Sequence, residues 1–281
     1  MNKIYEVTDN SIDIINFDDF DIKHILECGQ IFRFKKVDSG YIIYAKDVQI
    51  EVCCQKDRVK ILSKNLDFVK KYFDLNNNYA NIKLDLLKSN LMNKAIAYGF
   101  GIRILNQDPF ETLISFIISA NNNIPRIKKI IEAMCERFGE NKGSFYAFPT
   151  LQSLSNAREE DFRSIGCGYR SAYLVDTIKT LKNGFDLEEL FKLDTIEARA
   201  KLMSLKGVGR KVADCVLLFA YHKTDVFPTD TWIVQLYKDL TNETKPAIFI
   251  SNYFSKIFNV NSGYAQQYLF YEKMNQGEKN G

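Results

Sequence analysis

The sequence has little of the material from which metal centres, disulfide scaffolds and membrane spans are built. It contains six cysteines and two histidines, and no two cysteines have the C-x-x-C spacing, which disfavours a zinc site, an iron–sulfur cluster and a disulfide framework. No apolar run approaches the roughly 18 residues of a membrane span. Acidic residues soon interrupt the first apolar residues, which disfavours a signal peptide. We therefore expect a protein of the reducing cytoplasm that uses no cofactor.

The charges are close to balanced as well. A net charge of +3 and a pI of about 8.4 permit a polyanionic partner without requiring one, because phosphate binding depends on locally clustered lysine and arginine. The contents of 46% hydrophobic and 26% charged residues are ordinary for a globular protein. A chain of 281 residues can bury a core in about one to three domains.

The first third of the chain mixes strand and helix patterns. Short runs rich in β-branched and aromatic residues, separated by polar turns, predict strands. These strands cover residues 29–36, 41–45, 48–54 and 58–62, with turns at 38–40 and 55–57, and helices are expected at 66–73 and 84–98.

From residue 98 onward, the apolar spacing predicts almost only helices. Asp108 and Pro109 are typical of an N-cap and a first helical position, and the helix that they begin ends at 121–123. Further helices are expected at 125–138, 154–165, 170–181, 187–193, 196–205, 208–222, 233–240, 246–257 and 264–274, with a frayed polar tail at 275–281. The predicted fold class is α+β, with an N-terminal α+β domain at 1–97 and a helical part at 98–281.

The stretch 202–232 combines a glycine turn, a lysine and an aspartate. Gly207 and Gly209 lie between two apolar-periodic runs and permit positive φ, which predicts a helix, a tight turn and a second helix. Amides at the start of the second helix can bind a phosphate oxygen. Lys211 lies in the first turn of that helix, and Asp230 follows nineteen residues later, just before a new apolar run.

The run Gly207-Val208-Gly209-x-Lys211-Val212-Ala213-Asp214-Cys215 resembles the helix-hairpin-helix DNA glycosylases, and within them the 8-oxoguanine DNA glycosylase branch. Gly-x-Gly alone would be weak, since many turns carry it, but the lysine and the distant aspartate make the resemblance specific. It implies an antiparallel sheet with helices, like that of the TATA-binding protein, followed by an all-α core with the helix-hairpin-helix motif at about 196–222. The iron–sulfur glycosylases fit less well, because no cysteine follows Cys215.

The resemblance assigns the chemistry to Lys211 and Asp230. In the family, the matching lysine attacks C1′ of the damaged nucleotide, expels the base and forms a Schiff base, and β-elimination then nicks the strand. The positive end of a helix disfavours an ammonium, and a neutral amine can form an imine. Asp230 is expected to stay ionised beside a helix N-terminus and to stabilise positive charge on the sugar. Without the resemblance, Lys211 would be a solvated lysine and Asp230 a helix N-cap.

Two further segments resemble the DNA contacts of the family. Asn121 would fill the hole left by the flipped base, and Arg126 would read the opposite base. Tyr169 would be the wedge that keeps the duplex open, and Arg170 would contact the orphaned cytosine. The plain alternatives are a polar loop with caps, a core tyrosine and a surface arginine. The hairpin residues that would bind the DNA backbone are Gly207, Val208 and Gly209.

Five residues resemble the base pocket of the family. The carbonyl of Gly29, in Cys-Gly-Gln-Ile-Phe-Arg, would accept the N7–H of 8-oxoguanine, a hydrogen bond worth roughly 1–3 kcal/mol that guanine cannot make. Gln266 would read the base edge, and Phe270, four residues later on the same helix face, would stack on the base. Cys215 would pack on the other face of the base. Trp232 replaces a histidine of many eukaryotic members, which predicts a reshaped pocket. Alone, these residues would be a turn glycine and core side chains.

The sequence thus predicts a bifunctional DNA repair glycosylase that flips out and excises 8-oxoguanine from double-stranded DNA, opposite cytosine. We expect a monomer that lies in the cytoplasm with the nucleoid. One alternative is a monofunctional alkylated-base glycosylase, although such enzymes lack the hairpin lysine. Another is a non-catalytic helix-hairpin-helix DNA-binding protein, which needs neither Lys211 nor Asp230. No catalytic metal is expected, and the resemblance offers a candidate hairpin cation at the carbonyls of Met203, Leu205 and Val208.

Overall fold

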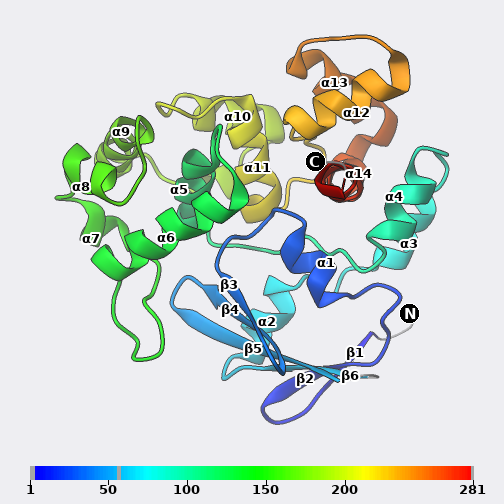
Figure 1. The fold of residues 1–281 in the computed structure, drawn as a ribbon, viewed down its shortest axis with the longest axis horizontal. Coiled ribbons are helices and arrows are strands. Elements are labelled where there is room, and N and C mark those ends of the chain that lie inside the picture. The colour runs from blue at the N-terminus through cyan, green and yellow to red at the C-terminus, as the bar shows by residue number, and fades with distance from the viewer. Residues whose placement is uncertain (1–3, 56–57, 280–281) are drawn as a thin grey trace.

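One antiparallel sheet forms the base of the N-terminal part. The computed structural model describes residues 4–55 and 58–279 (Figure 1). Its six strands lie in the order β1-β2-β6-β5-β4-β3, and each neighbouring pair is antiparallel. They are β1 Tyr5–Val7, β2 Ser11–Ile14, β3 Phe34–Val37, β4 Gly40–Ala45, β5 Val48–Gln55 and β6 Arg58–Leu62. An antiparallel sheet followed by helices confirms the predicted α+β class.

Apolar alternation explains the central strands of the sheet. Tyr41 pairs with Val52 and Ile43 pairs with Ile50, and all four side chains are buried. Because successive side chains of a strand point to opposite faces, these residues share one face of the sheet. That face therefore packs against the rest of the protein.

One expectation about this part is wrong, some short elements were not predicted, and one expected turn is not fully described. The strand expected from residue 29 begins only at Phe34, since Gly29 has a φ of +78°, outside the strand region. The sequence does not predict β1, β2 or the helix α1 (Ile22–Glu27), because three, four and six residues are too few for a clear period. Lys56 and Asp57, in the turn expected at 55–57, lie outside the described residues.

The rest of the chain is helical, as expected. Its helices are α2 Leu66–Tyr72, α3 Tyr79–Leu86, α4 Met92–Tyr98, α5 Pro109–Ser119, α6 Ile124–Phe138, α7 Leu151–Leu154, α8 Glu159–Ser164, α9 Arg170–Lys182, α10 Thr195–Met203, α11 Arg210–Tyr221, α12 Thr231–Thr241, α13 Ala247–Phe258 and α14 Ser262–Lys279, with 3₁₀ turns η1 Glu188–Phe191 and η2 Asn259–Asn261. No helix within the described ranges is both long and apolar enough to cross a membrane.

Several helix boundaries differ from the sequence prediction. The helix expected at 84–98 is divided into α3 and α4, and the one expected at 154–165 into α7 and α8. The second division arises because Asp161 accepts a hydrogen bond from the Arg158 N–H at 2.8 Å and so starts a new helix. The segment expected to be helical at 187–193 is only the 3₁₀ turn η1.

The frayed tail expected at 275–281 is also wrong over most of its length. Helix α14 continues through Lys279. The side chain of Asn275 donates to the Tyr271 carbonyl at 2.8 Å, and Gln276 donates to Glu272 at 2.8 Å, which supports the last turns. Residues 280–281 lie outside the described part of the chain.

Capping chemistry sets the start of the central helix α5. The Asp108 carboxylate accepts hydrogen bonds from the N–H groups of Phe110 and Glu111, each at 3.0 Å, and Pro109 occupies the first helical turn, as predicted. This fixes where α5 begins. Its other end therefore delivers the chain to the polar segment that starts at Asn121.

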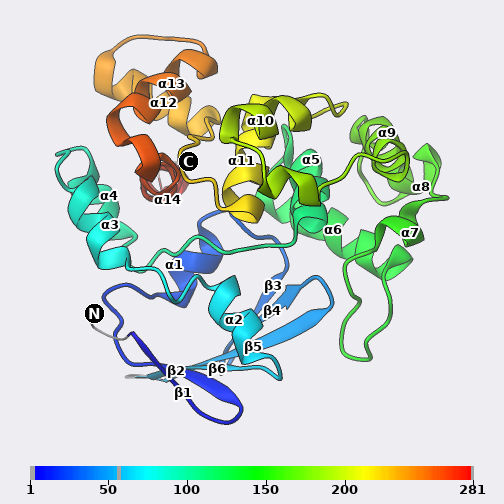
Figure 2. The ribbon, with the colours of Figure 1, turned by 180° about the vertical axis from the view of Figure 1, so that it is seen from behind.

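Two hydrophobic clusters organise the molecule. The smaller one packs the sheet against α1 and α2, which lie between the sheet and the other helices (Figures 1 and 2). The larger one joins the helical part, through whose middle α11 and α14 run. Side chains of α3 and α4, such as Tyr79 and Met92, belong to this larger cluster. The domain boundary at residue 97 stays a prediction.

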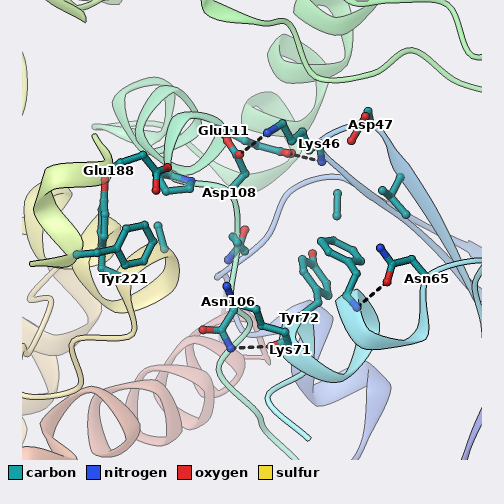
Figure 3. A pocket seen from close by; sticks show the side chains of 17 residues that line it. Lys46, Asp47, Asn65, Lys71, Tyr72, Asn106, Asp108, Glu111, Glu188 and Tyr221 are labelled. Atoms are coloured by element: carbon teal, nitrogen blue, oxygen red, sulfur yellow. Dashed lines mark hydrogen bonds and ion pairs between the residues drawn. The ribbon is translucent and has the colours of Figure 1, made fainter. Parts of the chain in front are cut away.

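A buried carboxylate joins the sheet to the helices. Glu111, in the first turn of α5, accepts a hydrogen bond from the Lys46 N–H at 2.7 Å and lies 3.7 Å from the Arg33 guanidinium. The Lys46 amine pairs with Asp108 at 3.1 Å. Lys46, Asp108 and Glu111 line a cleft of about 460 Å³ (Figure 3). Burial raises the pKa of Glu111 to about 7, although the charge of Arg33 opposes this rise.

We expect the stability of the protein to fall as the pH rises through the pKa of Glu111. The ordinary pKa of this carboxyl is 4.5, so between pH 4.5 and about 7 the folded protein binds more protons than the unfolded chain. Its favourable contribution is fully present below pH 4.5 and is lost as the pH rises through about 7. Glu111→Gln, which keeps a neutral side chain of the same shape, should flatten the pH dependence of the urea midpoint over this window. Equal slopes for both proteins would contradict the assignment.

Candidate active site

A glycine turn joins α10 to α11, where the sequence predicts the hairpin. Gly207 has a φ of +83°, and a Cβ there would lie 2.4 Å from the ring of Tyr173 on α9, so only glycine fits. Gly209 does not use the positive φ that glycine permits, because this residue is extended, with φ −86° and ψ 176°. Gly209 is the N-cap of α11, and glycine has no side chain with which to satisfy the first N–H groups of a helix. These N–H groups are suited to an anion.

Lys211 is the second residue of α11, and its side chain is half-buried. Its Nζ lies 5.2 Å from the centroid of the Phe116 ring on α5. Cys215 follows one turn later and is buried. Burial raises the pKa of its thiol to about 11, and the neighbouring Lys211 amine opposes this rise. The structure thus brings Lys211 and Cys215 together beside an aromatic ring.

Asp230 is the N-cap of α12, where it accepts a hydrogen bond from the Ile233 N–H at 3.0 Å. Burial raises the pKa of this carboxyl, and the Ile233 N–H and the charge of Lys211 oppose the rise. Burial and the N–H groups therefore act on this pKa in opposite directions, and the expectation that Asp230 stays ionised remains a prediction. The charge of Lys211 acts on this carboxyl, which supports the predicted pairing of amine and carboxylate.

The candidates for base recognition come from opposite ends of the chain. A Cβ on Gly29 would lie 2.9 Å from the Phe270 ring on α14, so the two residues are in contact. Gln266, one turn before Phe270, is buried, and its Oε1 accepts no hydrogen bond from the described residues. That oxygen is buried and lacks a partner within the described ranges, so a ligand that reached it would supply the missing hydrogen bond.

Gln267 is a residue of this pocket that the sequence does not single out. Its Nε2 donates a hydrogen bond to the carbonyl of Cys28 and so holds the segment that carries Gly29 against α14. The only sequence signal is the adjacent pair of glutamines, Gln266 and Gln267. Gln266 would bind the ligand, whereas Gln267 holds the backbone at Cys28.

The segment at Asn121 lies against the segment at Tyr169. Asn121 has a left-handed φ of +49°, which asparagine tolerates well. Tyr169 is 49% exposed, and its hydroxyl donates to the Ala120 carbonyl at 3.3 Å. Arg126 reaches the Gly166 carbonyl at 3.3 Å. The structure brings these predicted DNA-contact residues together where the loop before α6 and the first turn of α6 meet the loop before α9.

Arg170 differs from the expected surface residue. It is 3% exposed, and its guanidinium donates to the carbonyls of Ala120 and Asn121, each at 2.7 Å, and to that of Cys167 at 3.4 Å. The surface-arginine alternative is therefore wrong, since Arg170 shapes the Asn121 loop. A contact with a cytosine would require these hydrogen bonds to be exchanged, and it stays a prediction.

Asp214 also has a role that the sequence does not reveal. It is 1% exposed and accepts a hydrogen bond from the Nε of Arg199 at 2.5 Å, while the Nε of Arg210 lies 3.6 Å away. Because Arg199 is on α10 and Asp214 on α11, this ion pair closes the hairpin. The four-residue spacing of Arg210 and Asp214 is the only sequence signal for it.

A cavity of about 170 Å³ adjoins Lys211, with Met203, Thr229 and Ile248 among its lining residues. The Leu205 carbonyl, one of the candidate cation ligands, accepts a hydrogen bond from the Val208 N–H at 3.1 Å within the turn. The hairpin cation stays a prediction. The cleft of Figure 3 is a different feature, because it lies at the other ends of α5 and α11.

Comparison with known proteins agrees with this arrangement. Residues 14–113 match the family described as "8-oxoguanine DNA glycosylase, N-terminal domain", and residues 114–255 match "HhH-GPD superfamily base excision DNA repair protein".

Two solved structures are similar over nearly the whole chain. The Clostridium acetobutylicum 8-oxoguanine glycosylase/lyase, in complex with dsDNA containing cytosine opposite to 8-oxoG, is 39% identical with a TM-score of 0.91, over 97% of this chain and 98% of that one. MBOgg1, in complex with a low-affinity DNA ligand, is 38% identical with a TM-score of 0.92, over 99% of this chain and 100% of that one.

A curated relative matches over a shorter range. The N-glycosylase/DNA lyase of Saccharomyces cerevisiae is 39% identical over 156 residues, which are 49% of this chain and 41% of that protein. The matched part of this chain spans half or less of the length of such curated relatives.

Proposed function

This chain belongs to the 8-oxoguanine DNA glycosylase family within the HhH-GPD superfamily of base excision DNA repair proteins, and from that membership we propose that it excises 8-oxoguanine from double-stranded DNA and then cleaves the damaged strand. The observation that carries the proposal is a half-buried lysine, at a helix N-terminus without a side-chain cap, near the half-buried carboxylate of Asp230. Phosphate binding at that N-terminus would bring a sugar carbon to the amine.

The chemistry needs only residues of this site. The Lys211 Nζ forms a bond to C1′ while the bond from C1′ to the base breaks, and the base leaves with the electron pair. Asp230, when ionised, stabilises the positive charge that develops on the sugar. One proton of Nζ passes to the departing base and the other to O4′ as the C1′–O4′ bond breaks, so that the sugar ring opens to the Schiff base, in which C1′ is doubly bonded to nitrogen. Removal of a proton from C2′ expels the 3′ phosphate by β-elimination, which cleaves the strand.

The base pocket supports 8-oxoguanine as the substrate. The Gly29 carbonyl would accept the N7–H of the oxidised base, Gln266 would offer its free Oε1 to the base edge, and Phe270 would stack on the ring. Cys215 and Trp232 would complete the walls. Asn121, Arg126, Tyr169 and Arg170 would open the duplex and hold the partner base, which we propose to be cytosine. All of these residues belong to one chain, so we propose that the protein acts as a monomer. Its place of action would be wherever the cell keeps its DNA.

An excision panel tests this proposal. Duplexes that carry 8-oxoguanine, an alkylated base or normal guanine at one position, each opposite all four bases, should give the fastest base release for 8-oxoguanine opposite cytosine. Normal guanine lacks the N7–H, and one lost hydrogen bond of roughly 1–3 kcal/mol predicts slower release by about 5- to 150-fold from this contact alone. The measurement is single-turnover release of the base.

Other outcomes of the panel separate the alternatives. Release of an alkylated base without strand cleavage would indicate the monofunctional glycosylase. Tight binding of every duplex with all bases left intact would indicate the non-catalytic helix-hairpin-helix protein. Either result would overturn the proposed activity.

A further inference from the structure

We propose that Gly277, near the end of α14, positions Trp232 and, through it, the Asp230 carboxylate and one wall of the base pocket. The inference rests on the proposed function, because it concerns the rate and selectivity of the same site. Gly277 itself touches no reacting atom in this proposal, so it is a positioning residue.

The contact between the two residues leaves room for no side chain. A Cβ on Gly277 would lie 2.3 Å from both Cζ3 and Cη2 of Trp232. These atoms form the outer edge of the indole ring, so the ring edge rests on the backbone of α14. Trp232 is half-buried and packs against the larger hydrophobic cluster. Because packed interiors have few voids, a side chain at 277 would force the indole and its helix to move.

Such a movement would reach the carboxylate of Asp230. Trp232 is the second residue of α12, directly after the N-cap Asp230 and Thr231. The backbone N–H groups of Trp232 and Ile233 both favour the ionised carboxylate and lower its pKa against the effect of burial. A shift of Trp232 would therefore change the direction of the carboxylate and raise its pKa further.

Gly277 also shares a stripe of α14 with the pocket residues. Phe270 follows Gln266 by four residues, and Gly277 follows Phe270 by seven, which places all three on one helix face. Helices α12 and α14 are held together further along by an ion pair of Lys273 with Asp239 at 2.5 Å. The contact at Gly277 therefore sets the spacing of these helices at the end where Asp230 lies.

The change in stability caused by Gly277→Ala has the opposite sign for this contact and for the helix propensity of alanine. Glycine within a helix is less favourable than alanine, so Gly277→Ala should stabilise the protein if nothing faced it. The contact with Trp232 predicts the opposite, since the new methyl group meets the ring. Trp232 is the sole tryptophan of the chain, so its fluorescence reports on this contact directly.

The test is a double-mutant cycle with Gly277→Ala and Trp232→Phe in the full chain. With Trp232 present, Gly277→Ala should shift the emission maximum and slow the excision of 8-oxoguanine by about tenfold or more, since misplaced groups lose much of their rate. Its kcat should fall more than its KM changes, and the acid limb of the rate profile should move to higher pH. With Phe at 232, which lacks the outer ring atoms, Gly277→Ala should change the rate by less than about twofold.

Gln276→Ala on the same helix is the matched control. Among the described residues the exposed Gln276 side chain bonds only to Glu272, so this variant should leave emission and rate unchanged. An equal loss from Gly277→Ala in both backgrounds, or no shift of emission, would overturn the proposal. If the wild type excises no base, the proposed function fails, and the emission shift and the melting temperature alone decide whether Gly277 positions Trp232.

Discussion

Replacing Lys211 by glutamine is expected to abolish the covalent complex that borohydride traps between this protein and DNA containing 8-oxoguanine. Only an amine can form the imine that borohydride reduces, and an amide nitrogen cannot replace it. Glutamine keeps a polar side chain of similar length beside Cys215 and Phe116, so packing should be maintained. Base release should fall on the order of a thousandfold or more, as for other enzymes that lose a nucleophile. Denaturing gel electrophoresis of the trapped complex measures the result.

Lys206→Gln provides the matched control for this experiment. Lys206 lies in the turn that precedes α11 and is exposed, so its replacement removes the same charge without changing the contacts of Lys211. At saturating DNA it should trap as efficiently as the wild type. Trapping by Lys211→Gln at the wild-type level would show that Lys211 is not the nucleophile. The proposed mechanism would then be wrong.

Replacing Asp230 by asparagine is expected to separate catalysis from folding. Asparagine is as good an N-cap as aspartate, so the bond from the Ile233 N–H and the melting temperature should be kept. The variant loses the negative charge that would stabilise the sugar, and removal of one such group costs about 100- to 1,000-fold in rate. Single-turnover base release with melting curves for the same preparations gives both quantities.

Asp230→Ala is the comparison for Asp230→Asn. It should slow base release as well, and it should also destabilise the protein by about 1 kcal/mol because alanine cannot cap the helix. The pH dependence gives an independent check. Because burial raises the pKa of Asp230, the wild-type rate should decline with acid at a pH above the ordinary 3.8 of this carboxyl. Asp230→Asn should lack that decline. If Asp230→Asn released the base at the wild-type rate, the carboxylate would have no role in the reaction.

Local chemistry explains which parts could be predicted from the sequence. The start of α5 follows from Asp108 and Pro109, because an N-cap and a first-turn proline act within one turn of helix. The hairpin could be predicted because its motif is contiguous, while the catalytic pairing of Lys211 with Asp230 stays a prediction. Short elements such as β1 and α1 were not, because a few residues establish no period.

The remaining features depend on contacts between distant segments. The hydrogen bond from Gln267 to Cys28 joins residues 239 apart, and those from Arg170 to Ala120 join residues 50 apart. Neither partner can be identified from spacing. The raised pKa values of Asp230 and Glu111 have the same origin, since burial is a property of the packed molecule. The same motif also allowed positive φ at both hairpin glycines, and only the approach of Tyr173 to Gly207 shows where it is needed.

That approach has a consequence for how a lesion is located along a strand. Tyr173 packs against Gly207 on one side and edge-on against Tyr169 on the other, with ring centroids 5.9 Å apart. The turn suited to a phosphate and the tyrosine suited to unstacking a base pair are thus built on one solid block. If the turn holds a phosphate and Tyr169 opens the stack, as we propose, this contact would fix the number of nucleotides between those two points. The nucleotide presented to the Lys211 amine would then be chosen by its distance from the held phosphate, before any atom of its base is read.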